Sequence, residues 1–541
     1  MNTVYERFTT TAQVAPHADF LFVDAVTAEA YGIEAGAISW AQARAEVERL
    51  RRAYAAAGYG LGHRVGLLLE NRPAFLFHWF ALNGVGASVV PINAEMRSAE
   101  LEYLIGHSEI CLAVTLSRRE HDLRSAVRAA GVGCATLVFD ATDALPRASH
   151  APPPAGHAPG PASECALLYT SGTTGRPKGC RLSNEYFLRA GQWYADLDGV
   201  CSVRAGEERV ITPLPLNHVN AMAFSTMVVL TAGGCLVQLD RFHSKTWWTS
   251  VRTSRATIVH YLGVMPAMLL SAPACAADRE HDVRWGFGAG VDRSKHAAFE
   301  DRFGFPLVEA WAMTETGAAA CVMANHEPRH IGTNCFGKPG AFVDVRLVDD
   351  EGHDAPASVA GELLVRSAGA EPRRGFFSGY LKDDEATEDA WRDGWFHTGD
   401  IVRSDADGRL YFVDRKKNVI RRSGENISAL EVESVLNQHP AVQTVAVTAT
   451  HDDLRGDEVL ACVIARDPVS AEQRVALATS IVEHALAQLA YYKAPGYVAF
   501  VDALPLTASQ KIQRGELREL ARTLPGLAHC VDTRAMKKRQ G

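Results

Sequence analysis

The order of apolar and polar positions predicts short buried strands that alternate with helices in the first part of the chain. Helix-forming residues fill positions 41–57, after the capping residue Ser39 and before Gly58. Positions 64–69 are mostly apolar, as in a strand buried on both faces. A helix with proline in its first turn follows over 73–82. This alternation favours a largely parallel sheet covered by helices.

Two later stretches depart from this pattern. Residues 141–161 hold several prolines among alanine, glycine and histidine, which is typical of an exposed connection. Residues 344–348 and 362–366 are apolar runs separated by acidic residues and glycine. They predict antiparallel strands of a smaller β subdomain.

The pattern starts anew after the polar residues 414–418. Strands are predicted over 442–447 and 459–464, and a helix over 471–489. This order is typical of a small α+β domain. The predicted class is therefore α/β, with layered, mostly parallel sheets and a β subdomain in a large N-terminal domain. We expect that domain at 1–414, a hinge at 415–418, and a small mobile α+β domain at 419–541.

The composition of the chain favours some classes of function and argues against others. A chain of 541 residues is too long for one core, and 47% hydrophobic with 22% charged residues is typical of soluble enzymes. A net charge of -8 argues against a nucleic-acid-binding protein. Eleven cysteines without a Cys-x-x-Cys pair favour reduced thiols in the cytoplasm. The longest apolar stretch, 222–239, contains polar residues and predicts a buried helix that runs into a strand, not a membrane span.

A dense run of hydroxyl groups and glycines follows a predicted strand at 165–168. Residues 169–179 read Tyr-Thr-Ser-Gly-Thr-Thr-Gly-Arg-Pro-Lys-Gly. Glycines let backbone N–H groups approach an anion, and Lys178 adds a positive charge. The stretch therefore predicts a phosphate-binding loop, although taken alone it also fits an ordinary surface turn. The spacing of Gly175 and Lys178 does not fit the P-loop of NTPases.

This loop closely resembles the signature loop of the AMP-forming acyl-adenylate ligase superfamily. That superfamily includes acyl- and aryl-CoA ligases, peptide-synthetase adenylation domains and luciferases, and the resemblance covers essentially the whole chain. It is greatest towards crotonobetaine/carnitine-type and medium-chain acyl-CoA ligases. The resemblance implies ATP-dependent activation of a small or medium carboxylic acid to acyl-AMP, then transfer to coenzyme A, with Mg²⁺ as cofactor. The implied ATP contacts in the loop are Thr170, Ser171, Gly172, Thr173, Thr174, Gly175 and Lys178.

Residues 311–317, Trp-Ala-Met-Thr-Glu-Thr-Gly, resemble the aromatic-Gly-x-Thr-Glu motif of the superfamily. The match implies that Trp311 flanks the adenine and that Thr314 bonds the α-phosphate. It also implies that Glu315 binds magnesium, with Thr170 as a second ligand, since hard cations take oxygen ligands. Tryptophan replaces the usual tyrosine here, and alanine replaces the usual glycine at position 312.

Two further motifs complete the implied nucleoside site. The segment Gly288, Ala289 and Gly290 matches the glycine-rich strand end beside the adenine. Asp400, in Phe-His-Thr-Gly-Asp, matches the carboxylate that accepts hydrogen bonds from both ribose hydroxyls. Arg415 is implied as the second ribose contact.

The last two motifs lie in the C-terminal domain. Residues 505–514 resemble the Pro-x-Thr-x-Ser-Gly-Lys-Ile motif, with Gln510 in place of its glycine. The match implies that Lys511 bridges the substrate carboxylate and the α-phosphate, and that the domain turns at Lys417. Residues 423–427 resemble the CoA loop, in which Gly424 lets the pantetheine pass. The implied CoA contacts are Arg421, Ser423, Gly424 and Glu425, and Arg422 could also pair with CoA phosphates.

The acyl pocket and the acceptor are less defined by the sequence. His218 aligns with a superfamily histidine that borders the acyl site, and the other expected neighbours are Trp193, Asn220, Gly290, Met313 and Gly317. This mixture favours a short or medium acid, aromatic or polar, over a long chain. A stand-alone enzyme that loads a carrier protein and a non-catalytic acyl-adenylate sensor remain alternatives. The expected partners are the acid, ATP and CoA, without nucleic acid or a membrane span, and a homodimer is the default oligomer.

One apparent zinc motif is rejected. His326-Glu-Pro-Arg-His330 fits the zinc-protease pattern letter for letter. That site needs both histidines on one face of an unbroken helix, and Pro328 lies between them.

Overall fold

The computed structural model describes most of the chain. The residues outside the description are 143, 150, 171–176, 292, 294, 350, 416–419, 428, 506–511, 513 and 539–541. The chain forms two compact units, and each is described by itself. The first comprises Met1–Ala94, Ile105–Tyr169 and Gly179–Asp414, and the second comprises Glu95–Leu104, Thr170–Lys178 and Arg415–Gly541.

An eight-stranded sheet of the first unit carries several of the predicted site residues. Its order is β14-β13-β12-β11-β9-β10-β1-β2, and the strands from β13 to β10 are mutually parallel. Parallel strands end at the same edge of a sheet, so the residues after β9, β11, β12 and β13 meet there. The strands are β1 (Asp19–Val23), β2 (Gly36–Ser39), β9 (Arg209–Thr212), β10 (Cys235–Gln238), β11 (Ile258–His260), β12 (Trp285–Gly288), β13 (Leu307–Trp311) and β14 (Val322–Met323).

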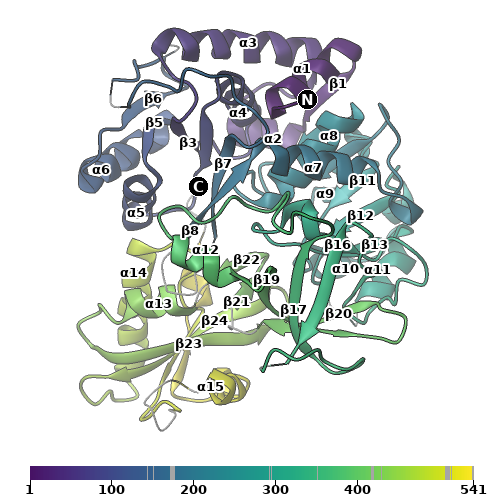
Figure 1. The fold of residues 1–541 in the computed structure, drawn as a ribbon. Coiled ribbons are helices and arrows are strands. Elements are labelled where there is room, and N and C mark those ends of the chain that lie inside the picture. The colour runs from purple at the N-terminus through teal and green to yellow at the C-terminus, as the bar shows by residue number, and fades with distance from the viewer. Residues whose placement is uncertain are drawn as a thin grey trace. The chain divides into compact units, whose positions relative to one another are not determined.

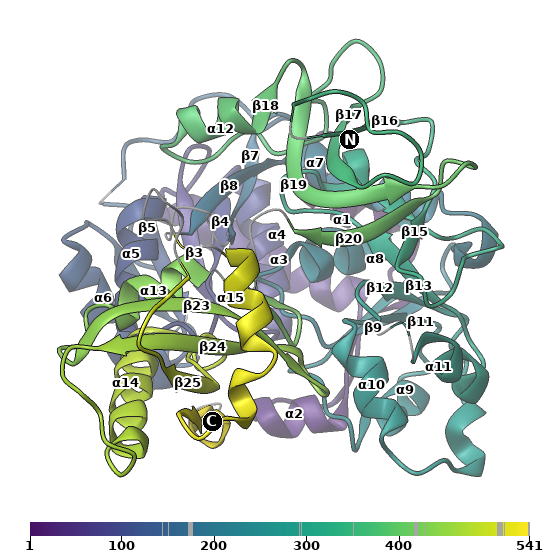
Figure 2. The same cartoon turned by 90° about the horizontal axis from the view of Figure 1, so that it is seen from below.

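Successive side chains of this sheet point to opposite faces. In β9, Val210 joins the large core of the unit, whereas its neighbour Ile211 joins a separate core. Ile258 and Val259 of β11 divide in the same way. The second core is covered by α9, α10 and α11, which group together beside the sheet in Figures 1 and 2. The helices on the two faces are α7 (Asn184–Ala195), α8 (Thr226–Ala232), α9 (Trp247–Thr253), α10 (Val264–Leu270) and α11 (His296–Phe303).

A second sheet of six strands has the order β6-β5-β3-β4-β7-β8. Its pairs from β6 to β7 are parallel, which confirms the sheet type predicted from the buried runs. The strands are β3 (Arg64–Leu68), β4 (Ser88–Pro91), β5 (Ile110–Thr115), β6 (Ala135–Val138), β7 (Glu164–Thr170) and β8 (Lys178–Ser183). The accompanying helices are α1 (Val4–Val14), α2 (Ala25–Tyr31), α3 (Trp40–Ala57), α4 (Pro73–Val85), α5 (Ser98–Ser108) and α6 (Glu120–Ala130).

Local signals explain the bounds of α3. The Ser39 hydroxyl accepts from the Gln42 N–H at 3.2 Å, and the Gln42 side chain accepts from the Ser39 N–H at 2.8 Å. This reciprocal cap satisfies two free donors at the helix start. Gly58 ends the helix with φ +90, a conformation that glycine adopts without steric cost. The helix predicted over 41–57 is thus confirmed.

A third, antiparallel sheet is the predicted β subdomain. Its order is β15-β20-β19-β17-β16, and β18 also pairs with β19. Its elements are β15 (Cys335–Gly337), β16 (Val343–Val348), β17 (Gly361–Ser367), α12 (Asp384–Ala390), β18 (Trp391–Arg392), β19 (Trp395–Ser404) and β20 (Leu410–Arg415).

The second unit has its own sheet and core. The sheet order is β22-β21-β24-β25-β26, with β23 paired to β24. Val432, Val447 and Ile481 are fully buried in the core between the sheet and its helices. The α/β class with a small α+β C-terminal part is thus confirmed. The elements are β21 (Ile420–Arg422), β22 (Glu425–Ile427), α13 (Ala429–Leu436), β23 (Val442–Asp452), β24 (Gly456–Ala465), α14 (Arg474–Gln488), β25 (Tyr497–Phe500), α15 (Arg514–Ala521) and β26 (Cys530–Asp532).

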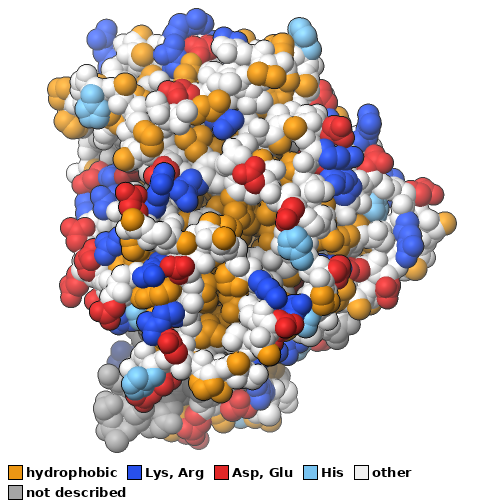
Figure 3. Space-filling model, turned by 45° about the vertical axis from the view of Figure 1, so that its right-hand side comes forward, with side chains coloured by type: hydrophobic (Ala, Val, Ile, Leu, Met, Phe, Trp, Pro, Cys, Tyr) orange, Lys and Arg blue, Asp and Glu red, His pale blue; other side chains and the backbone are white. Residues whose placement is uncertain are grey.

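The longest apolar stretch becomes a buried helix and then a strand, as predicted. A π-helical turn, Asn220–Ser225, opens it, followed by α8 and β10. The sequence did not predict the π-helical geometry. In the described part of the chain, every helix is too short or too polar to cross a bilayer. On the face shown in Figure 3, positive and negative side chains are interspersed.

Candidate active site

The carboxyl edge of the parallel strands gathers three predicted segments and one residue that was not predicted, His260. Gly288 ends β12 and Gly290 follows it, Trp311 ends β13, and Asn220 follows β9 in the chain. His260 ends β11 and lies opposite Phe287 of β12 in the register. In open α/β sheets, ligands bind outside this edge. The fold therefore assembles segments that are far apart in the sequence at a position suited to a ligand.

Asp400 of β19 reaches this edge next to a bulge in the strand. The register between β17 and β19 shifts between His397 and Ile401, and Gly399 adopts φ +67. Every second side chain from Phe396 to Val402 is buried, and Asp400 is one of them at 1% exposed. Its Oδ2 accepts a hydrogen bond from Trp311 Nε1 at 2.9 Å. The two predicted nucleoside residues therefore contact each other, and the tryptophan holds one oxygen of the carboxylate.

Glu315 is fixed by neighbours from two other segments. Its Oε1 accepts from the Tyr380 hydroxyl at 3.0 Å and from the Cys180 thiol at 3.7 Å. Burial, and then the Glu315 charge, raise the pKa of Tyr380 far above its usual range, so the phenol remains a donor. A carboxylate at a set position supplies the oxygen donors that a hard divalent cation requires, so the residues fit Mg²⁺.

The turn around Thr314 is shaped by α7. The Tyr186 hydroxyl donates to the Thr314 carbonyl at 2.8 Å. The Tyr186 ring also fills the space beside Gly317, where an added Cβ would lie 2.4 Å from a ring carbon. Gly317 has φ +49, so both the backbone and the packing require glycine there. Met313 and Thr314 are half-buried.

The glycine-rich segment after β12 is held by a carboxylate. Glu309 accepts hydrogen bonds from the backbone N–H of Gly290 at 2.9 Å and of Val291 at 2.8 Å. At Gly288, an added Cβ would lie 2.3 Å from the Tyr261 carbonyl oxygen. Ala289 between them is half-buried. The segment is thus pinned in a conformation that exposes backbone at the strand ends.

The expected acyl-pocket residues lie on neighbouring elements. The Trp193 ring of α7 packs on Phe224 at 5.6 Å and on Phe287 at 6.4 Å, measured between ring centroids. His218 is half-buried just before the π-helical turn, and Asn220 is the first residue of that turn. An aromatic wall therefore borders two polar side chains.

The expected CoA loop is the tip of a β-hairpin in the second unit. Ser423 and Gly424 connect β21 and β22 with φ +50 and φ +85, as a two-residue hairpin turn requires. Gly424 and Arg421 are exposed. Arg422 is instead buried, and its Nε donates to Glu458 at 2.8 Å. The expectation that Arg422 pairs with CoA phosphates is therefore wrong in this arrangement. Glu425 is half-buried at the start of β22.

Several predicted residues lie outside the described part of the chain. They are Ser171, Gly172, Thr173, Thr174, Gly175, Lys417 and Lys511. Arg415 ends β20, with its backbone alone described. Thr170 ends β7 and Lys178 begins β8, and both are half-buried. The roles of these residues stay predictions.

The sequence did not single out four residues that shape the site. Tyr380 and Cys180 fix Glu315, Glu309 fixes the glycine segment, and His260 contacts Asn220. None of them lies in a motif considered for the nucleotide. Of the four, only His260 could have been noticed in the sequence, because a histidine at the end of an apolar run is a polar residue at the end of a predicted buried strand.

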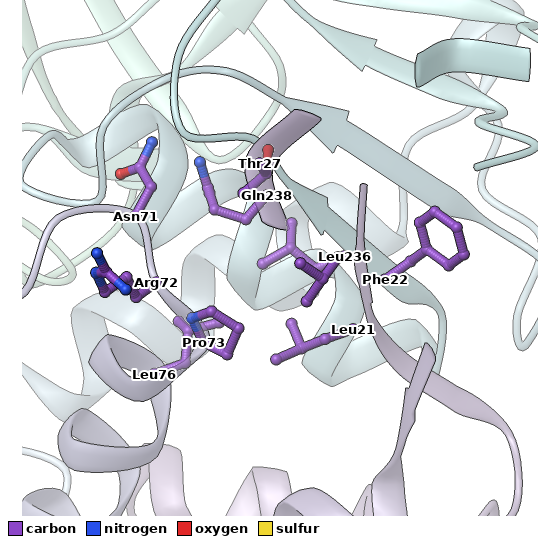
Figure 4. Close-up of a pocket in the computed structure, with 10 residues that line it drawn as sticks. Leu21, Phe22, Thr27, Asn71, Arg72, Pro73, Leu76, Leu236 and Gln238 are labelled. Atoms are coloured by element: carbon purple, nitrogen blue, oxygen red, sulfur yellow. The ribbon is translucent and has the colours of Figure 1, made fainter. Parts of the chain in front are cut away.

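A small cavity lies elsewhere in the first unit (Figure 4). Its lining includes Leu21, Asn71, Arg72 and Gln238, from β1, the start of α4 and β10. The Asn71 amide donates to the carbonyl of Leu239 at 2.8 Å. The cavity thus lies at a structural junction, and none of the predicted site residues lines it.

The apparent zinc motif does not form a helix. Residues 326–330 have no helical backbone. His326 Nε2 lies 3.0 Å from Asp198, whereas His330 Nδ1 bonds the Tyr411 hydroxyl at 2.8 Å. The two histidines therefore serve different local contacts.

Comparison with known proteins gives one consistent result. The AMP-binding enzyme family matches residues 10–381, and the AMP-binding enzyme C-terminal domain matches residues 431–511. Crotonobetaine/carnitine–CoA ligases from Shigella flexneri and Escherichia coli O157:H7 are each 28% identical over 507 residues, covering 91% of this chain and 95% of the relative.

Solved structures share the fold. An o-succinylbenzoate CoA synthetase from Bacillus subtilis has a TM-score of 0.80 at 24% identity, covering 96% of this chain and 98% of the other. The amide bond synthetase McbA from Marinactinospora thermotolerans has a TM-score of 0.80 at 24% identity, with coverage of 96% and 99%. A Mycobacterium tuberculosis fatty acyl CoA synthetase has a TM-score of 0.65 at 25% identity, with coverage of 96% and 98%. Since the family match spans most of the chain, this protein belongs to the AMP-binding enzyme family.

Proposed function

We propose that this enzyme activates a small or medium carboxylic acid with ATP to acyl-AMP and then transfers the acyl group to coenzyme A. The observation that carries the proposal is the contact between Asp400 and Trp311 at the strand edge that also presents Gly288–Gly290. A carboxylate, an aromatic ring and exposed backbone are the groups that hold a nucleoside. Membership of the family and the ligase relatives support the same reaction.

In the first half-reaction, an oxygen of the substrate carboxylate attacks the α-phosphorus of ATP, and pyrophosphate leaves. Thr314 bonds the α-phosphate, and the loop from Thr170 to Lys178 holds the β- and γ-phosphates. Lys511 offsets the repulsion between the two anions as the bond forms. Glu315 and Thr170 would hold Mg²⁺, which would supply positive charge to the phosphates. Asp400 and Arg415 bind the ribose hydroxyls.

In the second half-reaction, the C-terminal domain turns at Lys417 and brings the Ser423–Gly424 turn to the acyl-AMP. The sulfur of the CoA thiolate attacks the acyl carbonyl carbon, and AMP leaves with the electron pair of the broken C–O bond. Arg421 and Glu425 lie beside the turn to bind CoA. His218 borders the acyl group and closes the thiol passage to water.

A panel of carboxylic acids tests the proposal. We expect at least one acid to support pyrophosphate exchange with ATP, and AMP release that requires CoA and yields a thioester. Glu315→Gln should lower both rates by at least about a hundredfold, since it removes a metal-binding charge. Chelation of Mg²⁺ should abolish both.

The remaining outcomes separate the alternatives. Pyrophosphate exchange without thioester formation would contradict CoA as acceptor and favour a carrier protein. Nucleotide binding without exchange for every acid would contradict catalysis and favour a sensor.

A further inference from the structure

A buried polar chain lies behind the expected acyl pocket. His260 is fully buried at the end of β11, stacked on Tyr194 with ring centroids 5.6 Å apart and packed on Phe287 at 4.9 Å. Its Nε2 lies 2.8 Å from the Tyr194 hydroxyl, and its Nδ1 lies 2.6 Å from Asn220 Oδ1. Burial lowers the pKa of His260 to about 3, so the ring is neutral and carries one hydrogen.

The contacts decide which nitrogen carries that hydrogen. Asn220 Oδ1 can only accept, so His260 Nδ1 must donate. Ser225 Oγ also lies 2.9 Å from Nδ1, and its hydroxyl donates to the Asn220 carbonyl, which leaves the oxygen to accept. The Tyr194 hydroxyl then donates to Nε2. This one assignment, made from the hydrogen-bond network, satisfies both ring nitrogens and the three side-chain oxygens that face them.

This chain fixes the direction of the Asn220 amide. Its oxygen faces His260, so its NH₂ group points away from the buried ring. Asn220 is half-buried, and this NH₂ group has no partner among the described residues. A buried polar network inside an aromatic cluster is costly unless fully satisfied, and a satisfied one holds its members rigidly. The network therefore presents a preset donor.

The backbone supports the same placement. Asn220 begins the π-helical turn Asn220–Ser225, and such turns are frequent at functional sites. The turn follows β9, whose carboxyl end lies beside that of β11 in the sheet. The donor thus lies at the edge that also carries Gly288–Gly290 and Trp311.

We propose that the Asn220 amide selects carboxylic acids whose acyl group carries an oxygen acceptor, such as a ketone. The inference rests on the proposed function and names its substrate class. An oxygen in the acyl group can accept a hydrogen bond from the fixed NH₂ group. A hydrocarbon chain of the same length would remove water from the NH₂ group without supplying an acceptor. His260 and Tyr194 act as positioning residues, because they hold the amide and do not touch the substrate.

The test uses non-hydrolysable acyl-sulfamoyl adenosines, with AMP as a reference ligand. The probes are the hexanoyl compound and its keto isomers with the ketone at each position along the chain, and calorimetry gives each Kd. We expect at least one keto isomer to bind about ten- to hundredfold more tightly than the hexanoyl compound. Equal affinity of all probes would overturn the inference.

Three variants sharpen the test. Asn220→Asp keeps the oxygen that faces His260 but replaces the donor by a second oxygen, so the keto preference should vanish. Thr226→Val is the matched control, because its hydroxyl bonds the Ala221 carbonyl in the same turn, and it should keep the preference. Tyr194→Phe should weaken the preference without changing the AMP affinity.

Other outcomes are equally decisive. A keto preference retained in Asn220→Asp would overturn the role of Asn220. AMP binding without any keto preference would overturn the inference and leave the proposed function intact. If neither AMP nor any probe binds, both the proposed adenylate site and the proposed role of Asn220 would be contradicted.

Discussion

At the scale of single residues, hydrogen bonds between side chains decide how the site is held. Trp311 replaces the tyrosine expected from the motif, and its indole N–H bonds Asp400 at 2.9 Å. The hydroxyl group of a tyrosine at position 311 would not occupy the same position as this indole N–H. The motif matches identified both residues, but they could not reveal the contact, because it joins segments that are far apart in the sequence.

The Trp311–Asp400 bond makes a testable prediction. Trp311→Phe keeps an aromatic ring but removes the N–H, so Asp400 loses a charged hydrogen bond. We expect the KM for ATP to rise about tenfold, with a small change in kcat. With 2′-deoxy-ATP the difference between variant and wild type should shrink, because the bond acts through the ribose contact.

Trp285→Phe is the control, since its buried indole N–H has no partner among the described residues. It removes a similar ring volume from the neighbouring strand. An equal rise in KM in both variants would show that packing, not the hydrogen bond, causes the effect.

Buried histidines predict a pH dependence of stability. Burial lowers the pKa of His78 to about 4, against about 6.5 in an unfolded chain. Between these pH values the unfolded state binds more protons than the folded state. The contribution of His78 to the free energy of unfolding is therefore complete above about pH 6.5 and is lost as pH falls towards 4. Urea unfolding followed by tryptophan fluorescence should show the free energy of unfolding falling over this range. His78→Gln should reduce the slope by up to about 1.4 kcal/mol per pH unit, and an unchanged slope would contradict this account.

At the scale of elements, the sequence predicted regular pieces well and irregular ones poorly. Ser39 and Gly58 mark the two ends of α3 in the sequence, and an apolar run indicates the strand β3. The bulge at Gly399 and the π-helical turn at Asn220 carry no comparable local signal. Their geometry depends on neighbouring strands and side chains, so it could be seen only in the folded chain.

The bulge in β19 gives a prediction with a close control. Gly399 and Gly408 both have positive φ, +67 and +78, and open space where a Cβ would lie. Replacing either by alanine should cost about 1–2 kcal/mol of stability through backbone strain. Only Gly399 is adjacent to Asp400 and lies in the bulge, so only Gly399→Ala should raise the KM for ATP, by about tenfold. A similar KM for ATP in the two variants would contradict the role of the bulge.

At the scale of the whole molecule, two compact units divide the motifs. The first unit holds Glu315 and Asp400, and the second holds Gly424. The order of motifs along the chain predicted a large domain at 1–414 and a small one at 419–541, and these bounds stay a prediction. It could not predict the buried pairing of Arg422 with Glu458, because both residues look like ordinary surface charges in the sequence.

The central claim is that the C-terminal domain supplies different residues to two half-reactions. The most direct measurement is the rate of each half-reaction in Lys511→Ala and in Gly424→Val. We expect Lys511→Ala to lose acyl-AMP formation by at least about a hundredfold but still to convert supplied acyl-AMP to the thioester. Gly424→Val should show the reverse. Equal losses in both half-reactions for both variants would contradict the account.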